Sequence, residues 1–85
     1  MLIRRAQTKG GRRRLELHQV GAGSFRVVEM MGNGGERGAF VCNTLAEANA
    51  DFERVVADRL RYDGVRFEAH PDDAANSAYH AVTGG

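Results

Sequence analysis

The chain has 85 residues, 42% hydrophobic and 27% charged, which is enough for one small domain and excludes the large multidomain enzymes. Its single cysteine, Cys42, excludes an intramolecular disulfide and a four-cysteine metal cage. No apolar run approaches the about 18 residues of a membrane span, and residues 1–3 are too short for the core of a signal peptide. We therefore predict a soluble, cytoplasmic protein with no membrane partner.

The formal net charge of +1 conceals an uneven distribution. Six of the twelve basic residues and none of the eleven acidic ones lie in the first fourteen positions, so the rest of the chain carries −5. These six are Arg4, Arg5, Lys9, Arg12, Arg13 and Arg14. Clustered cations of this kind bind polyanions by releasing counterions from a phosphate backbone. A solvated, disordered terminus is the alternative explanation of the same pattern.

Two segments alternate apolar and polar side chains with the period of half-buried strands. Residues 12–20 alternate around Leu15 and Leu17, and residues 24–31 alternate around Phe25. The short Gly-Ala-Gly connection between them predicts a hairpin. The face away from the two leucines then carries Arg14, Glu16, His18, Arg26, Val28 and Met30. This face is left to solvent, to the C-terminal tail or to a partner.

A glycine-rich turn and a third strand follow the hairpin. Residues 32–38 contain four glycines in seven positions, and Asn-Gly and Gly-Gly pairs supply the positive φ angles of tight turns. Residues 39–42 are predicted to form the third strand.

A helix is predicted to begin after Thr44, because Thr44 and Glu47 have the spacing of a capping box. It is predicted to end at Gly64, since glycine is the usual residue just past a helix end. Its apolar positions recur at helical spacing and are Leu45, Ala48, Phe52, Val55, Val56 and Leu60. Glu47, Asp51, Arg54, Asp58 and Arg61 are predicted to face water. Residues 65–69 alternate as a short final strand, and a short helix is predicted over 72–82.

Together these elements predict an α+β fold, a small antiparallel β-sheet of three to four strands with one long α-helix packed on one face. The domain organisation follows as a basic N-terminal arm over 1–11, a folded domain over 12–69 and a C-terminal tail over 70–85. The aromatic core is predicted to consist of Phe25, Phe40, Phe52 and Phe67.

The segments 25–38, 44–48, 52–53 and 59–64 resemble the WGR domain family in order and spacing, and the resemblance covers residues 15–67. It implies a hairpin, a glycine-rich turn after the signature, a further strand and a Thr-capped helix closed by glycine. The family's Trp-Gly-Arg signature corresponds to Met31-Gly32-Asn33 here. WGR domains contact DNA ends in poly(ADP-ribose) polymerases, so the resemblance implies a binding module.

Residues for catalysis or metal binding are few. Cys42 precedes the predicted helix, and His18, His70 or His80 are the candidate bases for it, but a small buried hydrophobe explains Cys42 better. His70 and His80, with Asp72 and Asp73, match no standard metal spacing. The glycine turn lacks the Gly-Lys-Ser/Thr ending of a phosphate loop. We therefore predict no catalytic residues, no metal and no cofactor.

Two noncatalytic functions remain open. In the first, the chain contacts nucleic-acid phosphates through Arg4, Arg5, Lys9, Arg12, Arg13, Arg14, Arg26 and Arg37. In the second, it is a protein-interaction module such as a small inhibitor or adaptor, with an adaptable patch of Val28, Met30, Met31, Asn33 and Tyr79. A homodimer formed through the uncovered sheet face belongs to this second hypothesis.

Overall fold

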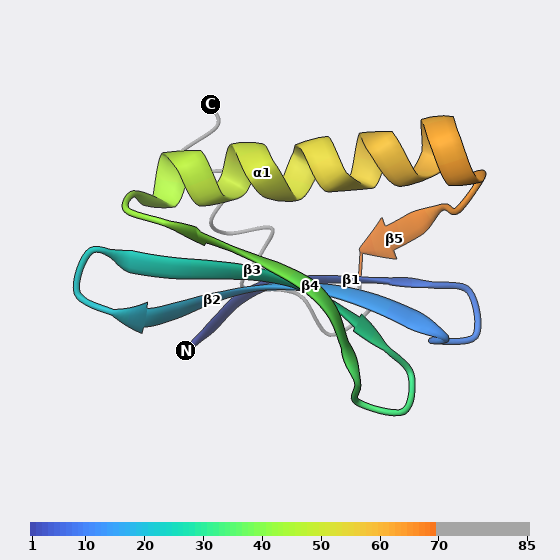
Figure 1. The fold of residues 1–85 in the computed structure, drawn as a ribbon, viewed down its shortest axis with the longest axis horizontal. Helices are drawn as coiled ribbons and strands as arrows, with labels where there is room; N and C mark the ends of the chain where they lie inside the picture. Colours follow the sequence, from blue (N-terminus) through green and yellow to red (C-terminus); the bar gives the residue numbers. More distant parts are fainter. Residues whose placement is uncertain (70–85) are drawn as a thin grey trace.

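The computed structural model describes residues 1–69, which form a five-stranded antiparallel sheet with one helix lying across one face (Figure 1). The strands are β1 (Leu2–Thr8), β2 (Arg13–Gly21), β3 (Ser24–Met31), β4 (Glu36–Cys42) and β5 (Phe67–Ala69). The helix α1 (Leu45–Asp58) continues into a single π-helical turn, η1 (Arg59–Asp63). The order across the sheet is β4-β3-β2-β1-β5. The predicted α+β class is confirmed, with one strand more than the upper count.

The additional strand is β1, which lies in the segment predicted as a basic arm. It pairs with β2 on one side, where Ala6 faces Leu15, and with β5 on the other, where Gln7 faces Glu68. Residues 1–11 are therefore not separate from the folded domain. The prediction failed because β1 does not alternate apolar and polar residues, since its core-facing side includes Arg4.

The predicted hairpin is confirmed as β2 and β3. Leu17 faces Val27 and Leu15 faces Glu29 across the pair. Both leucines and Val27 are buried beneath α1, so alternation places Arg14, Glu16, His18, Arg26, Val28 and Met30 on the other face, as predicted. Val28 is only 2% exposed on that face.

Strand β4 is longer than predicted, because it begins at Glu36 and takes in part of the glycine-rich segment. A register shift between the partners of Glu29 and Met30 accommodates the early part of the strand. Among the strands that the structure describes, β4 is the outermost, and it pairs with β3 alone. Phe40 is consequently 45% exposed, and its assignment to the core is corrected.

Helix α1 begins as predicted, because the Thr44 Oγ1 accepts a hydrogen bond of 3.1 Å from the Glu47 N–H. Its buried residues are Ala48, Phe52 and Val55. Leu60 is predicted on the same stripe but is 45% exposed, because it lies in η1, where the wider turn changes the angular position of the side chain. Gly64, with φ of 67°, ends this helical segment as predicted.

The core lies between the sheet and α1. It consists of Ala6, Leu15, Leu17, Phe25, Val27, Cys42, Ala48, Phe52, Val55 and Phe67. In the part of the chain that the structure describes, no helix has the length and apolar character needed to cross a bilayer. The helix predicted over 72–82 lies outside the described residues.

Candidate nucleic-acid interface

The turn between β1 and β2 is closed by Thr8. Its backbone carbonyl accepts from the Gly11 N–H at 2.8 Å, and its hydroxyl oxygen accepts from the Arg13 N–H at 3.1 Å. Gly10 and Gly11 have φ of 87° and 71°, which residues with a side chain rarely adopt. The turn therefore projects from the end of the sheet with its backbone fixed at both sides.

The turn between β3 and β4 is held against this first turn. The Gly32 N–H donates to the Arg12 carbonyl at 2.6 Å. A Cβ placed on Gly32 would lie 3.0 Å from the Gly11 carbonyl oxygen and 3.3 Å from that of Arg12. Only glycine fits this approach without a shift of backbone. Gly32 is thus the residue that allows the two turns to touch.

Together the two turns and the segment before β5 bring exposed residues to one end of the sheet. We call this the turn-end surface, defined by Lys9, Arg12, Met31, Asn33 and Arg66, all of them exposed. It contains two shallow hollows. The first is lined by Arg12, Arg13, Met31, Gly32 and Asn33. The second is lined by Thr8, Lys9, Arg12, Arg13, Val65 and Arg66.

The lining of these hollows is electropositive. Arg12 and Arg13 border both of them, and none of the described residues that line either one is a carboxylate. The 38% exposed Met31 adds a flexible apolar side chain at the rim. An arrangement of exposed cations beside an apolar contact suits a phosphate-bearing ligand that also has a flat or apolar part.

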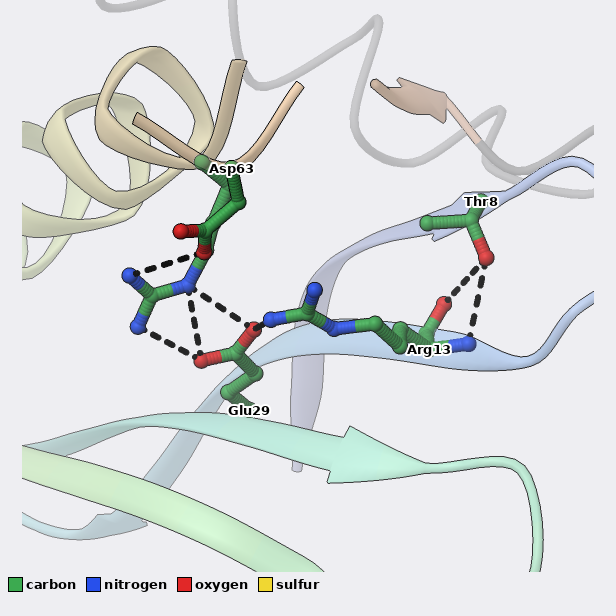
Figure 2. A network of polar contacts seen from close by, with 5 residues as sticks. Thr8, Arg13, Glu29 and Asp63 are labelled. Carbon is green, nitrogen blue, oxygen red and sulfur yellow. Dashed lines mark hydrogen bonds and ion pairs between the residues drawn. The ribbon is translucent and has the colours of Figure 1, made fainter. Parts of the chain in front are cut away.

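Beneath the turn-end surface, a buried carboxylate joins two arginines (Figure 2). The Arg13 Nη2 donates to the Glu29 Oε2 at 2.6 Å, and the Arg59 Nη2 donates to the Glu29 Oε1 at 2.9 Å. Arg59 also lies 3.7 Å from the Asp63 carboxylate. The network connects β2, β3 and the end of the helix, and fixes the stem of β2 from which the first turn projects.

Electrostatics in this network favour the charged forms. Burial raises the pKa of Glu29, but the hydrogen bonds from Arg59 and Arg13 outweigh burial and lower this pKa below its usual value. The hydrogen bond to Glu29 raises the pKa of Arg59. Glu29 is therefore ionised at neutral pH, and Arg13 is engaged in holding the fold.

Several residues predicted to contact nucleic acid lie elsewhere. Arg4 is buried, hydrogen-bonded to Asn49 and Glu53, with its guanidinium 4.2 Å from the centre of the Phe52 ring. Arg26 lies on the face away from the helix and donates to Glu36 at 2.6 Å.

The remaining basic residues of that prediction divide in the same way. Arg5 and Arg14 are partly buried on the face away from the helix. Arg37 is exposed on β4, away from the two hollows of the turn-end surface. Of the eight residues, Lys9 and Arg12 are exposed together, and Arg13 lies beneath them.

The predicted interaction patch is divided between two places. Val28 and Met30 lie on the face away from the helix, whereas Met31 and Asn33 lie on the turn-end surface. Tyr79 lies outside the described residues. The Asn33 side chain accepts from the Gly35 N–H at 2.9 Å, which stabilises the second turn.

Cys42 and His18 do not form a pair. Cys42 lies in the core under α1 and donates to the Asp51 carboxylate at 3.2 Å, while His18 lies on the other face beside Glu16. Burial and then the hydrogen bond to Asp51 raise the pKa of the Cys42 thiol to about 11. A neutral thiol of this kind is a poor nucleophile. His70 and His80 lie outside the described residues.

Two basic residues of the site, Arg66 and Arg59, were not predicted from the sequence patterns. Arg66 joins the turn-end surface because β5 returns beside β1. Arg59 falls within the end of the predicted helix, and its pairing with Glu29 spans 30 positions of the chain. The unexpected carboxylate at a core-facing strand position, Glu29, was the sequence signal that could have indicated a buried basic partner.

The comparisons add no relative to this description. No protein-family model, curated protein or solved structure matches the chain.

Proposed function

We propose that the chain is a noncatalytic nucleic-acid-binding module that uses the turn-end surface. The observation that carries the proposal is the contact of Gly32 with Gly11 and Arg12, which brings the two turns together and gathers Lys9, Arg12 and Arg66 beside Met31. Cations held at fixed positions on short turns contact phosphates without ordering a long segment on binding.

The resemblance to WGR domains supports the same surface. The positions of the family's Trp-Gly-Arg signature are those of Met31, Gly32 and Asn33, and the first hollow is lined by all three. Met31 lacks an aromatic face, so it offers packing to a sugar or base edge in place of stacking. Arg12, across the contact between the turns, supplies the positive charge beside Asn33.

A noncatalytic role is further supported by the chemistry of Cys42. Its thiol is protonated at neutral pH and lies on the opposite side of the sheet from His18. The unpaired cysteine also supports the proposed cytoplasmic location, where thiols stay reduced.

The proposal is tested by measuring binding to fluorescently labelled single-stranded and blunt double-stranded DNA as the salt concentration is varied. With two or three phosphate contacts, the logarithm of the affinity should fall with the logarithm of salt, by about 0.7 to 0.9 per contact. The double substitution Lys9→Ala and Arg12→Ala should weaken binding and reduce the magnitude of this slope by the amount expected for two phosphate contacts, about 1.4 to 1.8.

The matched control is the double substitution Arg26→Ala and Arg54→Ala, which removes the same amount of charge. Arg26 lies on the sheet face away from the helix and Arg54 lies on α1, so both are outside the turn-end surface. We expect it to leave the salt slope nearly unchanged. Equal losses in the two double variants would mean that binding depends on net charge alone and would contradict the proposed surface. Absence of binding to either DNA at low salt would contradict the function itself.

A further inference from the structure

The outer edge of β4 is long, and no other strand of residues 1–69 pairs with it. Six of its seven residues are exposed, and Phe40 and Val41 are 45% and 72% exposed. The opposite edge of the sheet is β5, which has three residues. A long, exposed edge presents unpaired backbone N–H and C=O groups and is a template for pairing with another strand.

A small cavity lies beside this edge, between β4 and α1. Its volume is about 90 Å³. Its lining consists of Leu15, Val27, Glu29, Arg37, Gly38, Phe40, Val55 and Arg59. A Cβ placed on Gly38 would meet no atom within 4 Å. The cavity therefore opens at Gly38, where β4 lacks a side chain on the helix side of the sheet.

We propose that β4 pairs antiparallel with β4 of a second copy of this chain, about a two-fold axis through Ala39. In this register Gly38 of one copy lies opposite Phe40 of the second copy. On the other side of the axis, Phe40 of the first copy lies opposite Gly38 of the second. Residues 38 and 40 of β4 point to the same face, since strand side chains alternate. Each exposed phenylalanine then covers the open glycine position of the other copy.

The self-complementarity of β4 favours a second copy over another partner. Phe40 and the open position at Gly38 lie on the same strand, one residue to either side of Ala39. A two-fold axis through Ala39 therefore places each phenylalanine opposite the glycine of the other copy, and the contact is made twice. Pairing of an aromatic residue with a glycine across neighbouring strands is a known way to stabilise an edge glycine. Residues 38–41 carry no charge, and the net charge of the chain is only +1, so electrostatic repulsion between copies is small.

The pairing joins two five-stranded sheets into one, with both helices on the same face. Because the two β4 strands run in opposite directions, the turn-end surfaces of the two copies lie toward opposite ends of the paired strands. Dimerisation through β4 does not require nucleic-acid binding. The contact is confined to one strand edge and its cavity, so we expect a weak dimer that dissociates on dilution.

The test measures the molar mass of the full chain by sedimentation from micromolar concentrations up to about 1 mM. The wild type is expected to change from monomer to dimer over this range. Ala39→Lys and Ala39→Glu should each be monomeric, since each places like charges opposite one another on the axis. An equimolar mixture of these two variants should again form a dimer, because an ammonium and a carboxylate would then face each other across the axis.

Two further variants control for effects on folding. Val20→Lys and Val20→Glu place the same charges on an exposed valine of β2, and both should dimerise like the wild type. Gly38→Leu fills the open position within its own copy and should be a folded monomer. A wild type that stays monomeric at about 1 mM, charged variants that dimerise separately, or a mixture that stays monomeric would each overturn the proposal.

Discussion

Glu29 occupies a position where the alternation of β3 calls for an apolar residue. It faces the helix between Leu15 and Gly38, and its carboxylate is buried. The buried charge is tolerated because Arg13 and Arg59 donate to both of its oxygens. The same pairing makes Arg13 a structural residue, although its place in the sequence resembles that of the exposed Arg12.

We predict that Glu29→Gln lowers the free energy of unfolding by about 2 kcal/mol near neutral pH, because two cations lose their counter-charge in a buried setting. The pKa of Glu29 is lowered in the folded state, so its contribution is complete above its unfolded pKa of about 4.3 and is lost as the pH falls through the lower, folded pKa. Urea unfolding of the wild type and of Glu29→Gln, from neutral pH down to below the unfolded pKa of Glu29, measures the difference in the free energy of unfolding.

The control for this prediction is Glu36→Gln, which breaks the exposed pair with Arg26. We expect little change, because solvent screens exposed pairs. A Glu29→Gln variant as stable as the wild type at every pH would show that the three-residue network does not stabilise the fold.

Cys42 provides a second prediction at the scale of single residues. Asp51→Asn removes the charge that stabilises the protonated thiol, so the pKa of Cys42 should fall from about 11 toward its ordinary value. The Cβ chemical shift of Cys42 in protein labelled at cysteine with carbon-13 measures this pKa in the folded protein, and the resonance has a single source because the chain has one cysteine.

Asp58→Asn is the matched control for Cys42, since Asp58 lies on the same helix and interacts with Arg54 rather than with the thiol. It should leave the titration of Cys42 unchanged. If both variants shift the pKa equally, the effect is due to general charge and the specific hydrogen bond to Asp51 has no role.

At the scale of elements, the contact between the two turns depends on Gly32. Gly32→Ala should lower the free energy of unfolding by about 1–3 kcal/mol, because the added Cβ meets two backbone carbonyls that cannot move independently. Thermal or urea unfolding measures this loss. Gly38→Ala is the control, because a Cβ there meets open space and the φ of Gly38 is not positive. Equal stability of the two variants would show that the turns are not held together by this contact.

The helix and the central hairpin could be predicted because their signals are local. The Thr44 cap, the apolar spacing around Phe52 and the Gly64 stop all act within a few residues. The π-helical turn could not be predicted in this way, and the environment predicted for Leu60 is wrong for that reason. The exposure of Phe40 likewise depends on β4 being the outer strand, which only the sheet order reveals.

At the scale of the whole molecule, β1 completes the sheet and connects β2 to β5. Ala6→Asp should therefore strongly destabilise the protein, by several kcal/mol, because it places a carboxylate in the core. Gln7→Asp, one residue further on and on the other face, should have a much smaller effect. Urea unfolding curves of the two variants measure the difference. If residues 1–11 were a detached arm, neither substitution would change the free energy of unfolding.

The sheet also divides the basic N-terminal segment between structure and surface. Arg4 and Arg13 are taken into ion pairs with acidic residues of the body, whereas Lys9 and Arg12 remain exposed at the turn. The opposition of a basic segment and an acidic body is thus partly neutralised within the fold. The exposed charge of this segment is therefore smaller than the sequence indicates, and Lys9 and Arg12 carry it at one end of the sheet.

The sequence alone determined the class of fold, the hairpin, the limits of the helix and the glycine-rich turn, because capping, periodicity and turn chemistry act over a few neighbouring residues. It also marked Lys9, Arg12, Met31 and Asn33 as candidates. Only the tertiary structure decided that these residues share one surface with Arg66 and that Arg4 and Arg13 are used to stabilise the fold. Strand order and long-range ion pairs determine which basic residues are exposed and which stabilise the fold. Both depend on contacts between residues far apart in the chain, so no local sequence pattern predicts them.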